Sequence, residues 1–246
     1  MKKNRSMWML YAGSTAKGLL LILIGMAAVE SGLFWYTVTS SMSGPEPYQS
    51  ISDLMGMAKL HVVFFAAFVL WSLVLTVFSH TKAVYTLDRL RVTPIRRLVI
   101  HALYNTLSYV VLIAAQVGVA VGLVLWYKTQ VDVFQYGPQS MLMAFYMSDF
   151  LRNLFPLGEV LLVVKNILLM GAMGLLTASV SVGLRTSNGY LVPLAMAMAH
   201  LAFFYLSRIG YGLSGLGTAS ITWIFAGGVA FAVWPILKGV EGYDKE

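Results

Sequence analysis

Long uninterrupted runs of apolar residues constrain the fold of this chain more than any other feature. Each run has roughly the 20 residues that a helix needs to cross a hydrocarbon core of about 30 Å. Because the runs are continuously apolar, they do not fit the alternating strands of a membrane barrel. The sequence therefore predicts an all-α polytopic membrane protein that forms one transmembrane domain, residues 1–246. Its six predicted transmembrane helices cover approximately residues 18–39, 58–80, 99–127, 158–184, 189–208 and 217–237.

The composition agrees with a membrane protein and argues against soluble classes. Hydrophobic residues make up 59% of the chain and charged residues only 11%, whereas about 25% charged residues is usual in a soluble domain. The net charge of +7 is spread between the apolar runs and forms no single patch, so we expect no nucleic-acid partner. The chain has no cysteine, which excludes a disulfide, a thiolate metal site and a cysteine nucleophile.

The distribution of Lys and Arg predicts the orientation of the six spans. The N-terminal residues 1–17, the loop 81–97, the turn at Arg185 and the C-terminus together hold 12 Lys and Arg, and the opposite side holds 4. Cationic loops stay in the cytoplasm, so both termini are expected there. Residues 1–17 are interpreted either as an interfacial helix on the inner leaflet or as a simple positive flank.

The loop at residues 81–97, TKAVYTLDRLRVTPIRR, carries five of the 17 Lys and Arg. Apolar residues at 84, 87 and 90 share one helical side, which predicts a short amphipathic helix. Thr93 precedes a proline and is therefore disfavoured in the α region, while Pro94 suits the first position of the next helix. The alternative is a solvated loop whose arginines contact anionic lipid.

The run YTLDRLRVTPIRRLVIHALYN, residues 85–105, resembles the segment before the third span of bacterial ABC-2-type permeases. Their pattern is Tyr-Thr-Leu-x-Arg-Leu-x-[Val/Ile]-[Ser/Thr], and in that family the segment is a coupling helix seated on a separate ATPase subunit. The family's exporters usually carry re-entrant helices between the fifth and sixth spans, and the loop near residues 208–217 is too short for them. The resemblance implies these coupling residues: Tyr85, Thr86, Leu87, Arg89, Leu90, Arg91 and Thr93.

The resemblance also implies a function. The chain would be a permease subunit in a bacterial cytoplasmic membrane, exporting a hydrophobic or amphipathic substrate. Its partners would be ATPase subunits, a second permease chain and the lipid bilayer. The sequence has no phosphate-binding GxxxxGK[ST] motif, so no cofactor is expected on this chain, and ATP and Mg would bind the partner ATPase. We expect no catalytic residue and no metal site, because no HExxH or comparable spacing occurs.

Ionisable side chains inside apolar runs are costly and are candidate functional groups. Glu30 and Lys165 each lie about seven residues from the outer end of their run, so a buried pair at matched depth is plausible. Such a pair would fix helix register or contact a substrate. An ion-coupled carrier and a non-transporting membrane scaffold are the alternative functions. The intramembrane candidates are Glu30, Lys165, His61 and His200.

Two further patterns predict local structure. The outer loop at 128–157 has apolar residues at helical spacing from 141 to 155, which predicts an amphipathic helix lying on or dipping into the outer leaflet. Small residues line one side of the fourth run and permit close approach of a neighbouring helix. They are Gly171, Gly174, Ala178 and Ser181.

Overall fold

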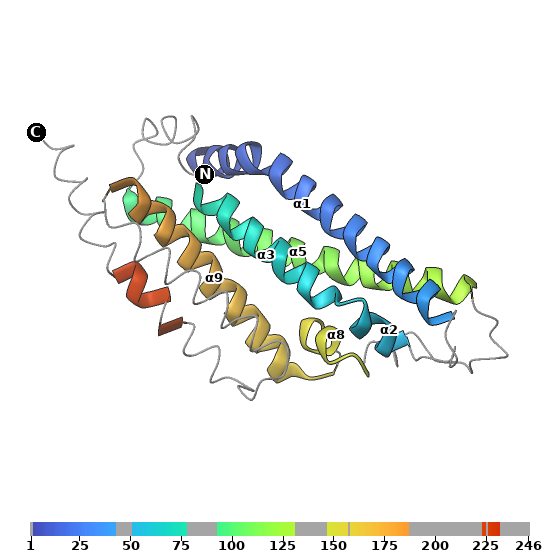
Figure 1. Cartoon of the computed structure of the whole chain (residues 1–246). Helices are drawn as coiled ribbons and strands as arrows, with labels where there is room; N and C mark the ends of the chain where they lie inside the picture. Colours follow the sequence, from blue (N-terminus) through green and yellow to red (C-terminus); the bar gives the residue numbers. More distant parts are fainter. Residues whose placement is uncertain are drawn as a thin grey trace, which may run out of the picture.

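The described part of the chain is helical wherever it has regular structure (Figure 1). The computed structural model describes residues 2–42, 51–77, 93–130, 147–156, 158–186, 223–224 and 226–231. Its helices are α1 Lys2–Met42, α2 Ile51–Met57, α3 Leu60–Val77, α5 Pro94–Gln130, α8 Asp149–Leu154 and α9 Val160–Thr186.

Three of these helices are long and apolar enough to cross a membrane, within Asn4–Ser41, Ile95–Thr129 and Val160–Ser181, and Leu60–Thr76 is a shorter apolar helix. The prediction of an all-helical fold is confirmed for the described residues, and the three long apolar helices are compatible with the predicted membrane protein. Of the six predicted spans, the first four each coincide with one of these helices. The fifth lies outside the described residues, and the sixth is described only at residues 223–224 and 226–231, which are helical.

Successive long helices run in alternating directions. Tyr11 and Phe34 of α1 contact His101 and Tyr127 of α5, in the same order along both helices, so α1 and α5 are parallel. Side-chain contacts run in opposite orders between α3 and α5 and between α5 and α9, so each of these pairs is antiparallel. Helix α5 packs against each of the other three, and α3 lies between α1 and α9. Alternation is what consecutive membrane crossings produce.

Helix α1 is one continuous element of 41 residues, longer than the predicted span 18–39. The predicted segment at 1–17 therefore has no break before the span, although Figure 1 shows the first turns of α1 at an angle to the rest. Near this bend the hydroxyls of Ser14 and Thr15 both donate to the carbonyl oxygen of Tyr11, each at 2.9 Å. Back-bonding of this kind is known to bend helices.

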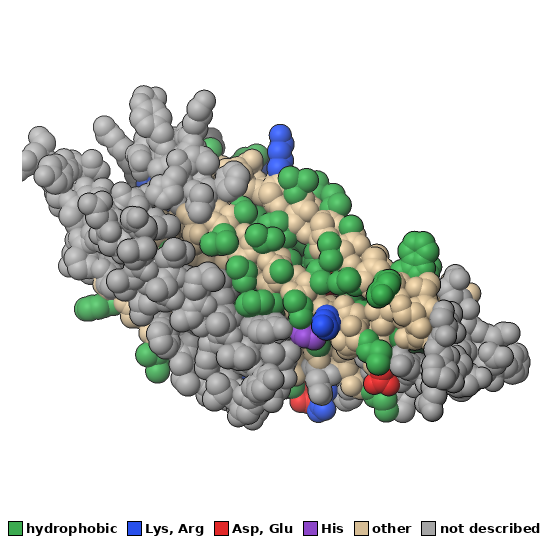
Figure 2. Space-filling model, in the orientation of Figure 1, with side chains coloured by type: hydrophobic (Ala, Val, Ile, Leu, Met, Phe, Trp, Pro, Cys, Tyr) green, Lys and Arg blue, Asp and Glu red, His purple; other side chains and the backbone are tan. Residues whose placement is uncertain are grey.

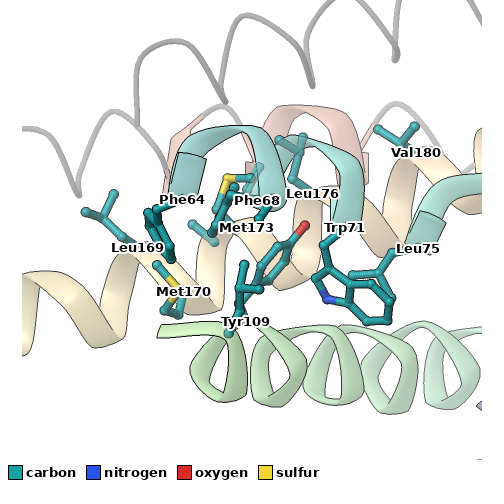
Figure 3. Close-up of a cluster of buried hydrophobic side chains, with 14 of the residues drawn as sticks. Phe64, Phe68, Trp71, Leu75, Tyr109, Leu169, Met170, Met173, Leu176 and Val180 are labelled. Carbon is teal, nitrogen blue, oxygen red and sulfur yellow. The ribbon is translucent and has the colours of Figure 1, made fainter. Parts of the chain in front are cut away.

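A cluster of large side chains forms the core between α3, α5 and α9 (Figure 3). Trp71 and Phe68 of α3 are fully buried, as is Tyr109 of α5. The rings of Phe68 and Tyr109 stack with their centroids 4.7 Å apart. Methionine side chains of α9, including Met173, fill the remaining space, as expected of a flexible thioether chain.

Glycine sets the distance between α5 and α9. A Cβ atom on Gly174 would lie 2.6 Å from the carbonyl oxygen of Ala102, 2.8 Å from the amide nitrogen of Thr106 and against the Thr106 hydroxyl. Only a residue without a side chain fits there. The predicted close approach along the small-residue side of the fourth run is confirmed at this position, and Ala178 is likewise buried against α5.

Two short helices cover one end of the bundle. Helix α2 turns into α3 at Lys59, whose φ of 51° is unusual for a residue with a side chain. Helix α8 starts at Asp149, and the extended Ser148 caps it through its side chain. The amphipathic helix predicted over 141–155 is therefore not continuous through Ser148. Phe150 of α8 packs near Phe64 and His61 of α3.

The outward faces of the long helices are apolar. Figure 2 shows hydrophobic side chains distributed across the described surface on this side, with few charged groups among them. Exposed apolar side chains include Leu21 and Trp35 on α1, with exposed fractions of 71% and 62%, and Ile167 on α9, with 65%. Water does not favour so much exposed apolar area, whereas lipid chains do.

Candidate functional site

Helix α5 carries a row of buried polar side chains on the face that meets the other helices. The row contains Asn105, Ser108, Tyr109 and Gln116, all at least 95% buried. Their spacing of three, one and seven residues keeps them on one side of a helix. Together they contact α9, α3 and α1, so this face of α5 is the polar interior of the described structure.

The part of the row nearer Pro94 is closed by hydrogen bonds between neutral groups. The amide Nδ2 of Asn105 donates to Thr177 Oγ1 of α9 at 2.9 Å. The indole of Trp71 donates to Ser108 Oγ at 2.9 Å. The hydroxyls of Ser72 and Tyr109 are 2.7 Å apart. These bonds join α5 to both α3 and α9 at one level.

Aromatic groups hold α1 against the same part of α5. The rings of Tyr11 and His101 stack at a centroid distance of 4.6 Å and an angle of 4°. Tyr104 lies next to them, and its hydroxyl is 2.5 Å from Thr15 Oγ1. Trp8 meets Tyr104 edge to face. This aromatic contact fixes the register between two helices that the chain separates by about 90 residues.

Glu30 and Gln116 form the buried polar contact at the other level of the row. Gln116 Nε2 donates to Glu30 Oε2 at 3.0 Å, and both residues are fully buried. The second oxygen of each group, Oε1 of Glu30 and Oε1 of Gln116, has no hydrogen-bond partner among the described residues. Among the residues whose burial is described, Glu30 has the only fully buried carboxyl group.

Apolar clusters enclose this pair on both sides. On α1, Met26 belongs to the cluster around Tyr109, and Phe34 belongs to a second cluster around Leu123. Glu30 lies one turn from each of these two residues. Gln116 lies in the same way between the two clusters on α5, so apolar side chains separate the pair from both ends of the bundle.

The sequence suggested Lys165 as the partner of Glu30, but in the structure the side-chain partner of Glu30 is Gln116. Lys165 is 98% buried on α9, but α9 packs on α5 and α3, and the side-chain partner of Glu30 is Gln116. Glu30 lies twelve residues before the end of α1, and Lys165 lies five residues after the start of α9. Matched depth in two apolar runs does not place their helices side by side.

The remaining predicted site residues divide into two groups. His61 is half-buried in the first turn of α3, with its ring 6.2 Å from that of Phe150. Thr93 is exposed directly before α5, and its carbonyl oxygen accepts a hydrogen bond from the amide of Arg97 at 3.1 Å. His200 and six of the seven predicted coupling residues lie outside the described residues, namely Tyr85, Thr86, Leu87, Arg89, Leu90 and Arg91.

Sequence reasoning missed Gln116 and the neutral members of the row because it considered only ionisable side chains within the apolar runs. A signal was present. Asn105, Tyr109 and Gln116 recur at intervals of four and seven residues within an otherwise apolar helix, which is the period of one helical face. Polar groups at that spacing in a membrane span indicate a face turned toward other helices.

Comparison of the chain with protein-family models, curated proteins and solved structures found no match. The arrangement of the site therefore carries the functional argument. No group of three or more His, Cys, Asp or Glu side chains able to hold a metal occurs among the described residues. The row on α5 can hold helices in register, and at Glu30 it places one acid where an apolar bundle rarely tolerates one.

Proposed function

We propose that this chain is the permease subunit of an ATP-binding-cassette exporter, driven by separate ATPase subunits. The observation that supports the proposal is the position of α5. This helix begins at Pro94, directly after the basic segment whose residues 85–93 resemble the coupling helix of ABC-2-type permeases. It then continues without a break to Gln130 and contacts α1, α3 and α9.

The length of α5 suits a transmitting role. At about 1.5 Å per residue its 37 residues extend roughly 55 Å, well beyond a hydrocarbon core of about 30 Å. Part of the helix would then stand outside the bilayer on the side of the basic segment. A displacement applied at residues 81–97 would move α5 as one rigid element, and α5 would carry it to the three helices bonded to its polar face.

In this proposal the nucleotide chemistry belongs to the partner ATPase, where ATP and Mg would bind. This chain would contribute a docking segment, a transmitting helix and the membrane path for a hydrophobic or amphipathic substrate. A second permease chain would complete the path across the cytoplasmic membrane. The orientation with both termini in the cytoplasm and the full set of six spans belong to the same proposal.

Copurification of the native complex tests the proposal. We expect an ATPase to accompany the tagged chain in fixed stoichiometry, and the combined substitution Arg89→Glu and Leu90→Glu to remove it while the chain stays folded. Lys128→Glu, at the exposed opposite end of α5, is the matched control and is expected to retain the ATPase. Recovery of the chain without any ATPase, together with silent substitutions at Arg89 and Leu90, contradicts the proposal.

An ion-coupled carrier is a second candidate, favoured by the buried Glu30–Gln116 pair. A carrier needs a group inside the membrane that takes up and releases an ion. The two candidates differ in their energy source. Collapse of the proton gradient with ATP intact should stop a carrier and leave the exporter active, and depletion of ATP with the gradient clamped should do the reverse.

A further inference from the structure

The Glu30–Gln116 pair has an excess of acceptors. An ionised glutamate only accepts hydrogen bonds, and a glutamine amide has one acceptor oxygen and one NH₂ donor group. Gln116 Nε2 serves Glu30 Oε2 at 3.0 Å. Two acceptor oxygens, one on each residue, then have no donor among the described residues. A proton on the carboxyl group would supply the missing donor.

The surroundings of the pair do not favour a negative charge. Glu30 has no exposed surface, and its neighbours one turn away on α1, Met26 and Phe34, belong to two apolar clusters. Its one described polar contact is the neutral amide of Gln116. A buried carboxylate without a cation or several donors is strongly disfavoured and takes up a proton instead.

We infer that the Glu30–Gln116 pair is a proton-binding site, in which Glu30 is a neutral carboxylic acid joined to the amide of Gln116. Both groups are planar and are already joined through Nε2 and Oε2. With the proton on Oε1 of Glu30, this oxygen becomes a donor and Oε1 of Gln116 becomes its acceptor. The acid and the amide then form two reciprocal hydrogen bonds, and neither residue keeps a charge or an unpaired oxygen.

A proton suits this site better than a metal cation does. Sodium, calcium or magnesium ions need several oxygen ligands in a shell, and the pair offers two unpaired oxygens. No larger group of acidic or histidine ligands is present among the described residues. Orphaned amide oxygens also occur on Asn105 and Asn166, but those residues are neutral and need no ion. The distinctive feature of Glu30 is a buried acid with one neutral partner.

Other titratable groups near α1 leave this assignment intact. His61 on α3 lies at a similar level, half-buried, with its ring against Phe150 of α8. Tyr109 lies two turns from Gln116 on α5 and is bonded to Ser72. On the same elements Tyr127 is buried in the second apolar cluster, and Tyr11, His101 and Tyr104 lie together in the aromatic contact that joins α1 to the Pro94 half of α5. The other groups on or next to these elements whose burial is described are Arg97, which is half-buried in the first turn of α5, and the exposed Arg5, Lys17, Tyr36, Asp53, Lys59, Arg96 and Lys128.

The inference couples the contact between α1 and α5 to pH. Loss of the proton would return a negative charge to an apolar enclosure and leave the two Oε1 oxygens facing each other without a donor. The two helices would be driven apart or water would enter between them. This consequence holds for an exporter and for a carrier alike, because it concerns the folded chain and does not rest on the function proposed above.

Infrared spectroscopy of the full-length protein in lipid tests the protonation state directly. A protonated carboxyl group gives a C=O band separate from that of a carboxylate, and the band shifts in D₂O. We expect this band at neutral pH in the unmodified protein and its loss in Glu30→Gln. Glu159→Gln is the control, because Glu159 is half-exposed and bonded to Arg152, and it should leave the band intact.

Stability as a function of pH provides a second readout. A proton held in the folded protein and released on unfolding makes stability fall as the pH rises above about 4.3, where a solvated glutamate ionises. We expect the Tm of the unmodified protein to fall over this range and the Tm of Glu30→Gln to vary less. Glutamine reproduces the neutral acid as a donor and acceptor, so Glu30→Gln should unfold at or above the unmodified Tm.

Three results would overturn the inference. The first is a protonated-carboxyl band unchanged in Glu30→Gln. The second is a Glu30→Gln variant that fails to fold or unfolds at a clearly lower Tm, since an ionised and paired Glu30 would produce that outcome. If Glu30 were ionised and paired with Lys165, Lys165→Met should lower the Tm similarly, and the double variant Glu30→Gln with Lys165→Met should regain part of the lost stability. The third is a Tm that responds to added sodium at fixed pH and does not respond to pH.

Discussion

The two halves of α5 make different kinds of buried contact with the neighbouring helices. Between Pro94 and Leu112 the helix meets its neighbours at a glycine contact and through hydrogen bonds between neutral groups, such as that of Asn105 with Thr177. Beyond Leu112 its buried polar contact is with a carboxyl group, Glu30. Neutral pairs fix geometry without regard to pH, whereas an acid in the same setting does so only while it holds a proton. One helix thus combines a permanent contact with a conditional one.

The largest expected effect comes from Gly174→Ala, which breaks the permanent contact. The added Cβ atom would overlap the backbone of Ala102 and Thr106 on α5, and a backbone cannot move aside as a flexible side chain can. We expect a loss of about 3 kcal/mol in the free energy of unfolding, the upper end of the usual cost of overpacking. Chemical unfolding in mixed micelles would measure it.

Gly118→Ala is the matched control for that substitution. Gly118 lies in the other half of α5 and has no described atom within 4 Å of the added Cβ position. Alanine favours a helix over glycine by roughly 0.5–1 kcal/mol, so stability should stay equal or rise slightly. Equal losses in the two variants would show that the glycine at 174 has no special packing role and would remove the contrast between the halves.

An intermediate effect is expected at Asn166, which holds α8 over the end of the bundle near Gln130. Its amide donates to the carbonyl oxygens of Asn153 and Leu154 at 3.0 and 3.3 Å. Asn166→Leu would leave these carbonyls without that donor, at a cost of about 1–2 kcal/mol. Because the loss is local, amide hydrogen exchange should accelerate in α8 and remain slow around Trp71.

Ile167→Ala provides the comparison for Asn166→Leu, because Ile167 is the next residue of α9 and points outward with 65% of its surface exposed. Exchange in α8 should be unaffected by this substitution. If both variants accelerate α8 equally, the amide of Asn166 does not hold the short helix. If Asn166→Leu accelerates exchange throughout α3 and α5, then α8 unfolds together with the core as one cooperative unit.

The smallest effect is expected at the ion pair of Arg152 with Glu159, which joins α8 to the residue before α9. The side chains are 46% and 36% exposed, so water and salt weaken the attraction. Arg152→Gln should cost less than about 1 kcal/mol. A double-mutant cycle with Glu159→Gln would give the coupling energy, and a value above that limit would mean that the surface of this end is less solvated than its exposure indicates.

The sequence was sufficient to predict features that depend on one segment at a time. Pro94 was predicted as the first residue of its helix and is the first residue of α5. The fourth span was predicted at 158–184 and α9 covers Val160–Thr186. Both follow from local chemistry, namely the fixed backbone angle of proline and the length of an apolar run. Gly174 was predicted as a close contact because small residues recur along one side of the fourth run, which is also a property of that segment alone.

Features that depend on which segments are neighbours were not predictable in this way. The depth of Glu30 suggested Lys165, but depth is one coordinate, and the lateral order of the helices decides the partner. Gln116 was overlooked because an amide does not stand out among apolar residues as a charge does. Helix α2 was also missed, since its seven residues are too few for a periodic pattern to emerge.

The helices that contact α5 also differ in when they are synthesised relative to α5. A chain that leaves the ribosome N-terminus first delivers Glu30 to the membrane before Gln116, so that contact can form as soon as α5 enters. Asn105 must wait for Thr177, which follows 72 residues later. Until α9 arrives, the amide of Asn105 lies in the lipid phase without its eventual acceptor. The contacts of α5 are therefore completed only by a later part of the chain. Truncation before α9 would leave α5 inserted in the membrane without the hydrogen bond between Asn105 and Thr177.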